Sequence, residues 1–212
     1  VHVLDNAGEN LLTLINDVLD ISQIEAGRVE LSLRRFSLRE LTNQVGDLLA
    51  LRAQEKGLEF QITVDPEASA CYEGDPDRIK QILINLLSNG VKFTETGSVR
   101  LDVRVIDSNT EGGQGLEFNV RDTGGGIPAD KLEISFESFR QVDDSRTRRY
   151  QGTGLGLHIS RELARLMQGD IHVRSTPEEG SVFTLALKLP VFAGQPTLEP
   201  EISTQSGARP RR

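Results

Sequence analysis

A predicted helix in the middle of the chain carries two carboxamides and an ammonium group on one polar stripe. Asn85 and Asn89 are four residues apart, which places them about 40° apart around a helix axis and about 6 Å apart along it. Lys92 extends the same stripe. Carboxamide oxygens suit Mg²⁺, which usually bridges substrate phosphates, and a lysine suits the phosphates themselves. The stripe therefore predicts a magnesium and phosphate site, with a solvated helix face as the alternative.

A first glycine cluster directly follows a predicted strand that ends near Val120. Residues 122–128 read DTGGGIP, and three successive glycines allow another group to approach the backbone closely. Asp122, at the end of the strand, can accept a hydrogen bond from an exocyclic amine such as that of adenine. The cluster predicts an adenine-binding turn, and a flexible turn between a strand and a helix is the alternative.

A second glycine cluster leads straight into a predicted helix. Residues 151–157 read QGTGLGL. Glycines at a helix start expose backbone N–H groups where the helix dipole favours anions, so the segment predicts a phosphate cradle. It is not a Walker loop, because no Gly-Lys-Ser/Thr follows. It also lacks the preceding strand and the glycine spacing of a dinucleotide-binding fingerprint.

The composition is that of an ordinary globular protein with an acidic balance. The chain of 212 residues has room for one or two domains, with 37% hydrophobic and 26% charged residues. A net charge of -8 argues against a nucleic-acid binder, which needs a basic face. The single cysteine, Cys71, cannot form an internal disulfide, which fits a reducing cytoplasm. No long apolar run or signal peptide is present, so we expect no direct membrane contact.

The first 27 residues predict a helix that packs against other helices, because their apolar residues follow an a/d heptad seam. Nothing else before residue 27 can cover so wide a stripe. We therefore expect a helical hairpin whose first helix lies outside these residues, and dimerisation through this helix is a hypothesis. The seam consists of Leu4, Ala7, Leu11, Leu14, Val18 and Ile21, widened by Leu12, Ile15 and Leu19.

From Ser37 the pattern becomes that of a mixed helix and strand domain. Ser37 and Glu40 form a capping-box pair that begins an amphipathic helix to about residue 56. Asp75, followed by a proline, predicts the N-cap of the helix that carries Asn85. Helices combined with mostly antiparallel strands predict an α+β fold, a two-layer sandwich. The other predicted elements are strands over 58–64, 99–105, 116–120, 171–174 and 182–189, a loop over 108–115, a short helix after Pro128 and a helix over 155–167.

The order of the motifs resembles the ATP-binding domain of sensor histidine kinases. The asparagine-rich helix, the DTGGGI turn, residues 136–139 (FESF) and the GTGLGL segment correspond to that family's N, G and F boxes in sequence. Residues 16–31 also resemble the end of its dimerisation hairpin. The resemblance implies a Bergerat-type ATP-binding fold preceded by one long helix. The expected domains are the last part of the dimerisation and phosphoacceptor hairpin over 1–30, the catalytic domain over 31–190, and a flexible linker or tail over 191–212.

The resemblance also implies residue roles. Asn89 would bind Mg²⁺, Asn85 would lie close to the phosphates or the metal, and Lys92 would contact phosphate. Asp122 would bind the adenine amino group. The adenine pocket would also include Gly124, Gly126 and Ile127, and Phe139 would help to anchor the lid over the nucleotide. The end of the lid would be formed by Gly152, Thr153, Gly154, Leu155, Gly156 and Leu157. In the lid loop, Arg146, Arg148 and Arg149 would be either phosphate contacts or a solvated basic loop.

None of the three histidines lies in a sequence like the family's phosphoacceptor box. His2, His158 and His172 are followed by other residues, so we expect the acceptor on a helix outside this chain. The implied function is transfer of the ATP γ-phosphoryl group to that histidine, in a homodimer, for relay to the receiver domain of a response regulator. The protein would be cytoplasmic or the soluble part of a membrane-anchored sensor.

Two alternatives remain open. One is a degenerate kinase that holds nucleotide or pairs with another kinase as a regulatory module. The other is a gyrase-like ATPase, in which a glutamate occupies the place of Asn85 and activates water. A carboxamide cannot take a proton, which disfavours hydrolysis. Three departures from the family pattern are Gly90 in place of the common alanine, Ser138 in place of proline, and Ser135 before the F box.

Overall fold

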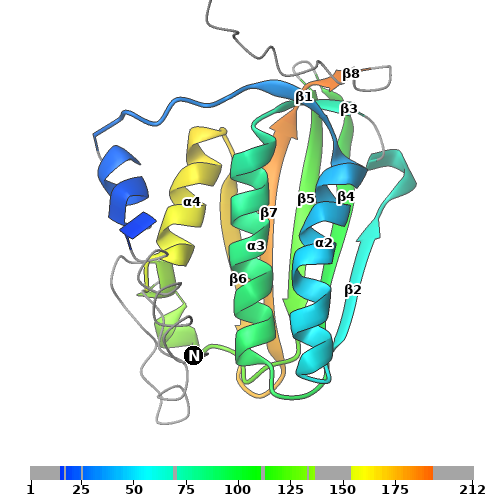
Figure 1. Ribbon diagram of the computed structural model, residues 1–212, viewed down its shortest axis with the longest axis vertical. Coiled ribbons are helices and arrows are strands. Elements are labelled where there is room, and N and C mark those ends of the chain that lie inside the picture. Colours follow the sequence, from blue (N-terminus) through cyan, green and yellow to red (C-terminus); the bar gives the residue numbers. More distant parts are fainter. Residues whose placement is uncertain are drawn as a thin grey trace, which may run out of the picture.

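The computed structural model describes residues 15–16, 18–24, 26–68, 71–110, 113–132, 134–136 and 154–192. Helices α2 (Leu38–Glu55), α3 (Pro76–Phe93) and α4 (Gly156–Leu166) lie side by side and cover one face of a five-stranded sheet (Figure 1). This arrangement confirms the predicted α+β two-layer sandwich. The strands of the sheet are β2 (Glu59–Val64), β4 (Ser98–Thr110), β5 (Gly113–Asp122), β6 (Asp170–Thr176) and β7 (Gly180–Leu189).

The large sheet is mixed, with strand order β2-β4-β5-β7-β6. β2 pairs with β4 in parallel, and the other neighbouring strands are antiparallel. The predicted loop over 108–115 was wrong, because β4 continues to Thr110 and β5 begins at Gly113. Shifts of register between Val105 and Asp107 and between Asp107 and Thr110 break the alternation of apolar residues, which hid these strand ends from the sequence.

A small second sheet was not predicted. β1 (Arg34–Ser37), β3 (Cys71–Gly74) and β8 (Val191–Phe192) pair in the order β1-β3-β8. These strands have two to four residues, too few to show a period of two in the sequence. The structure thus places Val191 and Phe192 in a strand, within the range that was expected to be a tail.

Both predicted helix N-caps are confirmed. The Ser37 hydroxyl accepts a hydrogen bond from the Glu40 N–H at 3.3 Å. The Asp75 carboxylate accepts from the N–H groups of Asp77 and Arg78 at 3.1 and 3.0 Å, and Pro76 occupies the first turn. Asp75 also accepts from the Ser32 N–H at 2.9 Å, so one buried carboxylate fixes both the start of α3 and the incoming chain.

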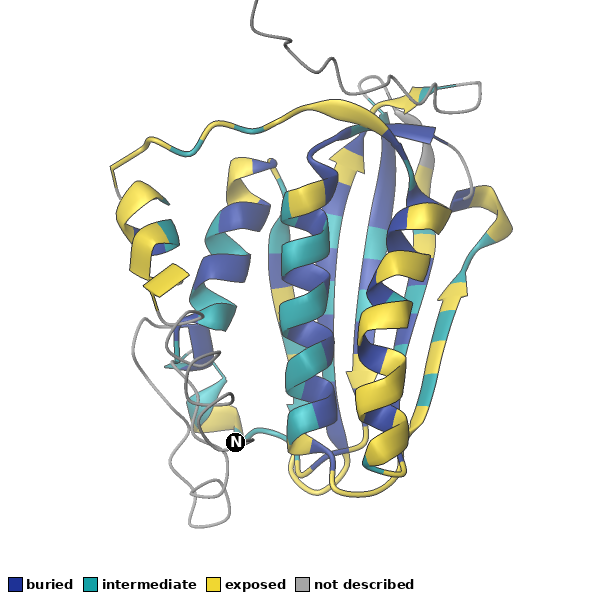
Figure 2. Cartoon of the chain, viewed as in Figure 1, coloured by how far each residue is buried: buried dark blue, intermediate teal, exposed yellow. Residues whose placement is uncertain are grey.

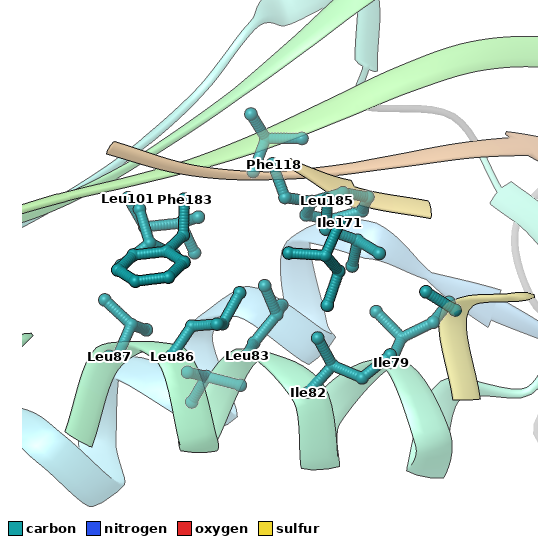
Figure 3. Close-up of a cluster of buried hydrophobic side chains, with 14 of the residues drawn as sticks. Ile79, Ile82, Leu83, Leu86, Leu87, Leu101, Phe118, Ile171, Phe183 and Leu185 are labelled. Carbon is teal, nitrogen blue, oxygen red and sulfur yellow. The ribbon is translucent and has the colours of Figure 1, made fainter. Parts of the chain in front are cut away.

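The apolar face of α3 positions the rest of the domain. Its buried residues point at the sheet, where they meet side chains of β4, β5, β6 and β7 (Figure 3). The exposed faces of the helices point away from the sheet (Figure 2). The helix therefore packs on the sheet by one side, and its adjoining polar stripe contacts α4 at Asn85. The labelled residues of this cluster are Ile79, Ile82, Leu83, Leu86 and Leu87 on α3 and Leu101, Phe118, Ile171, Phe183 and Leu185 on the sheet.

The residues before Gly27 that the structure describes are largely helical, as predicted. Ile21 is buried against the domain core and Ile24 packs on it, whereas Val18 and Leu19 are half exposed. Asp20 accepts hydrogen bonds from Gln81 at 2.8 Å and Arg78 at 3.5 Å. Leu4, Ala7, Leu11 and Leu14 of the predicted seam lie outside the described residues. Within the described part of the chain, no helix is long and apolar enough to cross a membrane.

Candidate functional site

The polar stripe of α3 meets α4 at Asn85. Its Nδ2 donates a hydrogen bond to the Ser160 hydroxyl at 2.9 Å, and its Oδ1 accepts one from Asn89 Nδ2 at 3.4 Å. A Cβ built on Gly156 would come within 3.0 Å of Asn85 Cγ and would overlap Oδ1, so only glycine permits this approach. The structure therefore brings three predicted site residues together, Asn85, Asn89 and Gly156, at the N-terminal end of α4.

Asn89 offers an oxygen ligand. Its amide nitrogen is engaged with Asn85, which leaves Asn89 Oδ1 without a hydrogen-bond partner among the described residues. Carboxamide oxygen is a hard donor of the kind that Mg²⁺ prefers. Across the described ranges there is no group of three or more His, Cys, Asp or Glu side chains that could enclose a metal. The donor set thus fits an ion that keeps several waters and is shared with phosphates.

Lys92 lies one turn further along α3, close to its C-terminal end. Its side chain is half buried, and this burial lowers the pKa of the ammonium group from its usual value. The Nζ atom lies 5.0 Å from the centre of the Phe93 ring. Phe93 is 42% exposed, so part of its apolar surface is accessible beside Lys92.

Asp122 ends β5 with its carboxylate buried at 7% exposure. Burial raises the pKa of this carboxyl, while hydrogen bonds from Gly124 and Ser181 act in the opposite direction. The Gly124 N–H donates to Asp122 Oδ1 at 2.9 Å. The carboxylate is therefore fixed in orientation by groups of the protein and presents a defined acceptor.

The turn after Asp122 is packed closely against its surroundings. A Cβ on Gly124 would come within 2.8 Å of the Phe93 carbonyl oxygen. Gly126 has a φ of +66°, and a Cβ there would overlap the backbone of Thr176. The Ile127 N–H donates to the Ser175 hydroxyl at 2.7 Å. These contacts connect the turn to the end of α3 on one side and to the β6–β7 hairpin on the other.

The two ends of the site are joined through α3. Gly90 packs so closely on the sheet that a Cβ would come within 3.0 Å of Val99 Cγ1 and 3.6 Å of Asp122 Cβ. Gly90, which stands where the resembling family commonly has alanine, therefore lies at a tight contact beside the Asp122 side chain. Asn89 precedes this residue on the helix, so α3 connects the Asp122 carboxyl to the Asn89 carboxamide.

Of the predicted second glycine cluster, the structure describes only the last four residues. Gly154 has a φ of +70° and Leu155 is fully buried, so its side chain belongs to the core. Leu157 packs against the same core, and Gly156 contacts Asn85 as described above. The other predicted lid residues lie outside the described part of the chain: Phe139, Arg146, Arg148, Arg149, Gly152 and Thr153.

Sequence reasoning missed four residues of the site. Ser181 lies opposite Asp122 in the β5–β7 register, and its hydroxyl is 3.0 Å from that of Ser175. Ser160 is a buried polar residue on the apolar face of α4, a signal that was visible in the sequence. The exposure of Phe93 could not be read from the sequence. Strand pairing alone brings Ser175 and Ser181 to the site.

Comparisons with known proteins show the family to which the chain belongs. Residues 74–191 match the family model described as histidine kinase-, DNA gyrase B-, and HSP90-like ATPase. The chain is 38% identical over 208 residues to the sensory/regulatory protein RpfC of Xanthomonas campestris pv. campestris. This alignment covers 98% of this chain and 28% of RpfC. It is 41% identical over 191 residues to the signal transduction histidine-protein kinase BarA of Escherichia coli K12, over 89% of this chain and 20% of BarA.

A solved structure shows the same fold with a nucleotide analogue present. The crystal structure of full-length ShkA in complex with AMPPNP superposes with a TM-score of 0.78 at 35% identity, over 91% of this chain and 39% of ShkA. The chain spans between a fifth and 28% of the length of RpfC and BarA. It belongs to the family of histidine kinase-, DNA gyrase B- and HSP90-like ATPases, as an ATP-binding domain of the sensor histidine kinase type.

Proposed function

We propose that this chain is the catalytic module of a sensor histidine kinase, which transfers the γ-phosphoryl group of ATP to a histidine on a dimerisation helix. The observation that carries the proposal is the junction at Asn85, where carboxamides and a serine hydroxyl meet the start of α4. A carboxamide there cannot remove a proton from water, so the site favours transfer to a separate nucleophile over hydrolysis.

Adenine binding is assigned to the buried end of the site. The Asp122 carboxylate would accept a hydrogen bond from the adenine amino group, held in place by Gly124 and Ser181. Gly126 and Ile127 would form the floor of the pocket, because their turn is fixed by Thr176 and Ser175. The exposed ring of Phe93 offers an apolar surface for the flat base.

Phosphate and metal binding are assigned to the polar stripe. Asn89 would hold Mg²⁺ through its Oδ1 atom, and Asn85 would orient the phosphates beside it. When bound, the metal ion would neutralise developing charge on the phosphoryl oxygens. Lys92 would contact the phosphates, and the start of α4 at Gly154, Leu155, Gly156 and Leu157 would present backbone N–H groups to them. Phe139, Gly152 and Thr153 would complete the lid.

The residues of this chain act by positioning and charge. Asn85 is itself oriented by Ser160, so its carboxamide has one direction available relative to α4. Phosphoryl transfer has a loose transition state, for which alignment and electrostatic stabilisation supply most of the catalysis. The attacking nitrogen would come from the acceptor histidine, whose own imidazole needs no base in this site.

The larger assembly is part of the proposal. A homodimer through the N-terminal helix, an acceptor helix outside this chain and a response-regulator receiver domain would complete the relay. The half-exposed Val18 and Leu19 support the dimer, since they are apolar and project away from the domain core. A cytoplasmic location is supported by the single, buried, free Cys71.

A phosphotransfer assay tests the proposal. A longer form of the protein that includes the acceptor helix is incubated with Mg²⁺ and ATP radiolabelled at the γ-phosphate. We expect an acid-labile label on the protein, and no label when the acceptor histidine is replaced by glutamine. Absence of label in a protein that binds nucleotide would contradict the kinase function and would support a regulatory nucleotide-binding module.

A further inference from the structure

We propose that Lys56 is a positioning residue of the ATP site, which holds the C-terminal end of α3 so that Lys92 and Phe93 face the nucleotide. Lys56 lies at the C-cap of α2, and its ammonium group donates hydrogen bonds to the carbonyl oxygens of Val91 and Lys92, both at 2.7 Å. This inference rests on the proposed ATP-binding function.

The last turn of a helix leaves carbonyl oxygens without partners inside the helix. In α3 the Gly90 carbonyl accepts from the Thr94 N–H at 3.0 Å, and those of Val91 and Lys92 accept from Lys56. The Phe93 carbonyl lies against Gly124 of the adenine turn. Lys56, which belongs to a different helix, thus bonds two of these carbonyl groups. Both lie on the segment of α3 between Asn89 and the proposed adenine turn.

The charge of Lys56 has a second effect. Helices α2 and α3 run in the same direction and end at the same edge of the domain (Figure 1). Their C-terminal dipole ends, each equivalent to about half a negative charge, therefore lie together where a triphosphate would bind. The partly buried ammonium group of Lys56, bonded to the end of α3, reduces the repulsion between these dipole ends and a bound triphosphate. Lys92, whose pKa is lowered by burial, is the cation proposed to contact the phosphates.

A second lysine provides a matched control. Lys80 also connects α3 to α2, because its Nζ donates to Gln44 Oε1 at 3.4 Å. That bond is exposed and lies in the first half of α3, away from Asn89 and Lys92. If Lys56 only tied the two helices together, its loss and the loss of Lys80 should affect nucleotide binding equally.

Nucleotide affinity of the full chain tests the role of Lys56. Binding of Mg²⁺ and AMPPNP is measured by titration calorimetry for the wild type, Lys56→Met, Lys56→Arg and Lys80→Met. We expect Lys56→Met to weaken binding about tenfold, Lys56→Arg to stay within about twofold, and Lys80→Met to match the wild type. If Lys56→Met does not fold, Lys56→Gln, which removes the charge and keeps a shorter donor, takes its place; it should bind more weakly than Lys56→Arg, and affinity equal to the wild type would overturn the inference.

A double-mutant cycle separates positioning from general stability. If Lys56 acts through Lys92, then Lys56→Met should add less than about twofold to the loss caused by Lys92→Met. Unchanged affinity in Lys56→Met, or fully additive losses in the double variant, would overturn the inference while leaving the proposed function intact. A wild-type protein that binds no nucleotide would overturn both, so the two failures are distinguishable.

Discussion

The two ends of the candidate site are built differently, although one helix joins them. At the proposed adenine end, Asp122 is buried, and its carboxylate accepts hydrogen bonds from Gly124 and Ser181. At the proposed phosphate end, Asn89 is partly exposed and keeps an oxygen without a partner among the described residues, and Asn85 is held by hydrogen bonds with Ser160 and Asn89. The first end is fixed by backbone packing, and the second by side chains on one helix face.

The difference matches what the proposed function would require of each end. An adenine ring is rigid and keeps the same hydrogen-bonding groups throughout a reaction, so a preformed acceptor in a close-packed pocket gains most from rigidity. A triphosphate changes its charge distribution as its terminal group leaves. Groups that stabilise that change must remain available to the ligand and to a metal ion. The comparison predicts distinct responses to substitution at the two ends.

The largest effect is expected at Asp122. Asp122→Asn should weaken nucleotide binding about 100-fold, because a buried, charged acceptor is replaced by a neutral amide in the adenine pocket. Calorimetric titration with AMPPNP measures this loss. Asp102→Asn, on the opposite face of the sheet, serves as the control and should bind like the wild type. Near-normal affinity in Asp122→Asn would show that the acceptor is not at this residue.

The same substitution has a predicted effect on stability. Burial raises the pKa of Asp122 in the folded protein, so its contribution to stability is fully present below the unfolded pKa and is lost as the pH rises through the folded value. Over that window the wild type should lose unfolding free energy relative to Asp122→Asn. Denaturant unfolding at several pH values gives this difference, and a parallel pH dependence of both proteins would contradict it.

The next effect separates two adjacent glycines of the adenine turn. Gly126→Ala should lower the unfolding free energy by about 2 kcal/mol, because an alanine is strained at a φ of +66° and its Cβ would overlap the Thr176 backbone. Gly125→Ala should change it by less than about 0.5 kcal/mol, since the space around that residue is open. Chemical denaturation measures both. Equal costs would show that close packing does not define this end.

A smaller effect is expected at the phosphate end. Asn89→Ala should weaken binding of AMPPNP about tenfold in Mg²⁺ and should leave binding in EDTA unchanged, because only the metal ligand is removed. Asn89→Asp, which keeps an oxygen at the same place, should retain the magnesium dependence. The titrations are repeated with and without the ion. A loss of the same size in EDTA would assign Asn89 to the nucleotide itself.

The smallest effect is a proton linkage at Lys92. Burial lowers the pKa of its ammonium group in the free protein, and a nearby phosphate favours the charged form. At alkaline pH below the usual value of 10.5, nucleotide binding should therefore be accompanied by uptake of a fraction of a proton. Calorimetry in two buffers with different ionisation enthalpies measures it. Lys92→Gln should show no uptake, and the same uptake in both proteins would locate the titrating group elsewhere.

Local patterns predicted much of the fold. The capping residues Ser37 and Asp75 begin their helices as expected, because each cap satisfies backbone donors within three residues of itself. The strands of the large sheet were found wherever their alternation held. The ends of β4 and β5 and the three short strands of the small sheet were not found, since a broken register and strands of two to four residues leave no periodic signal.

The sequence by itself determined the chemistry that the site offers: two carboxamides at helical spacing, a lysine on the same stripe, an aspartate before three glycines, and the absence of a carboxylate at residue 85. These follow from residue types and short-range spacing. Only the tertiary structure decided which groups orient them. Ser160, Ser181 and Lys56 come from other elements and reach the site through helix packing and strand register, contacts between residues far apart in the chain that no local pattern encodes.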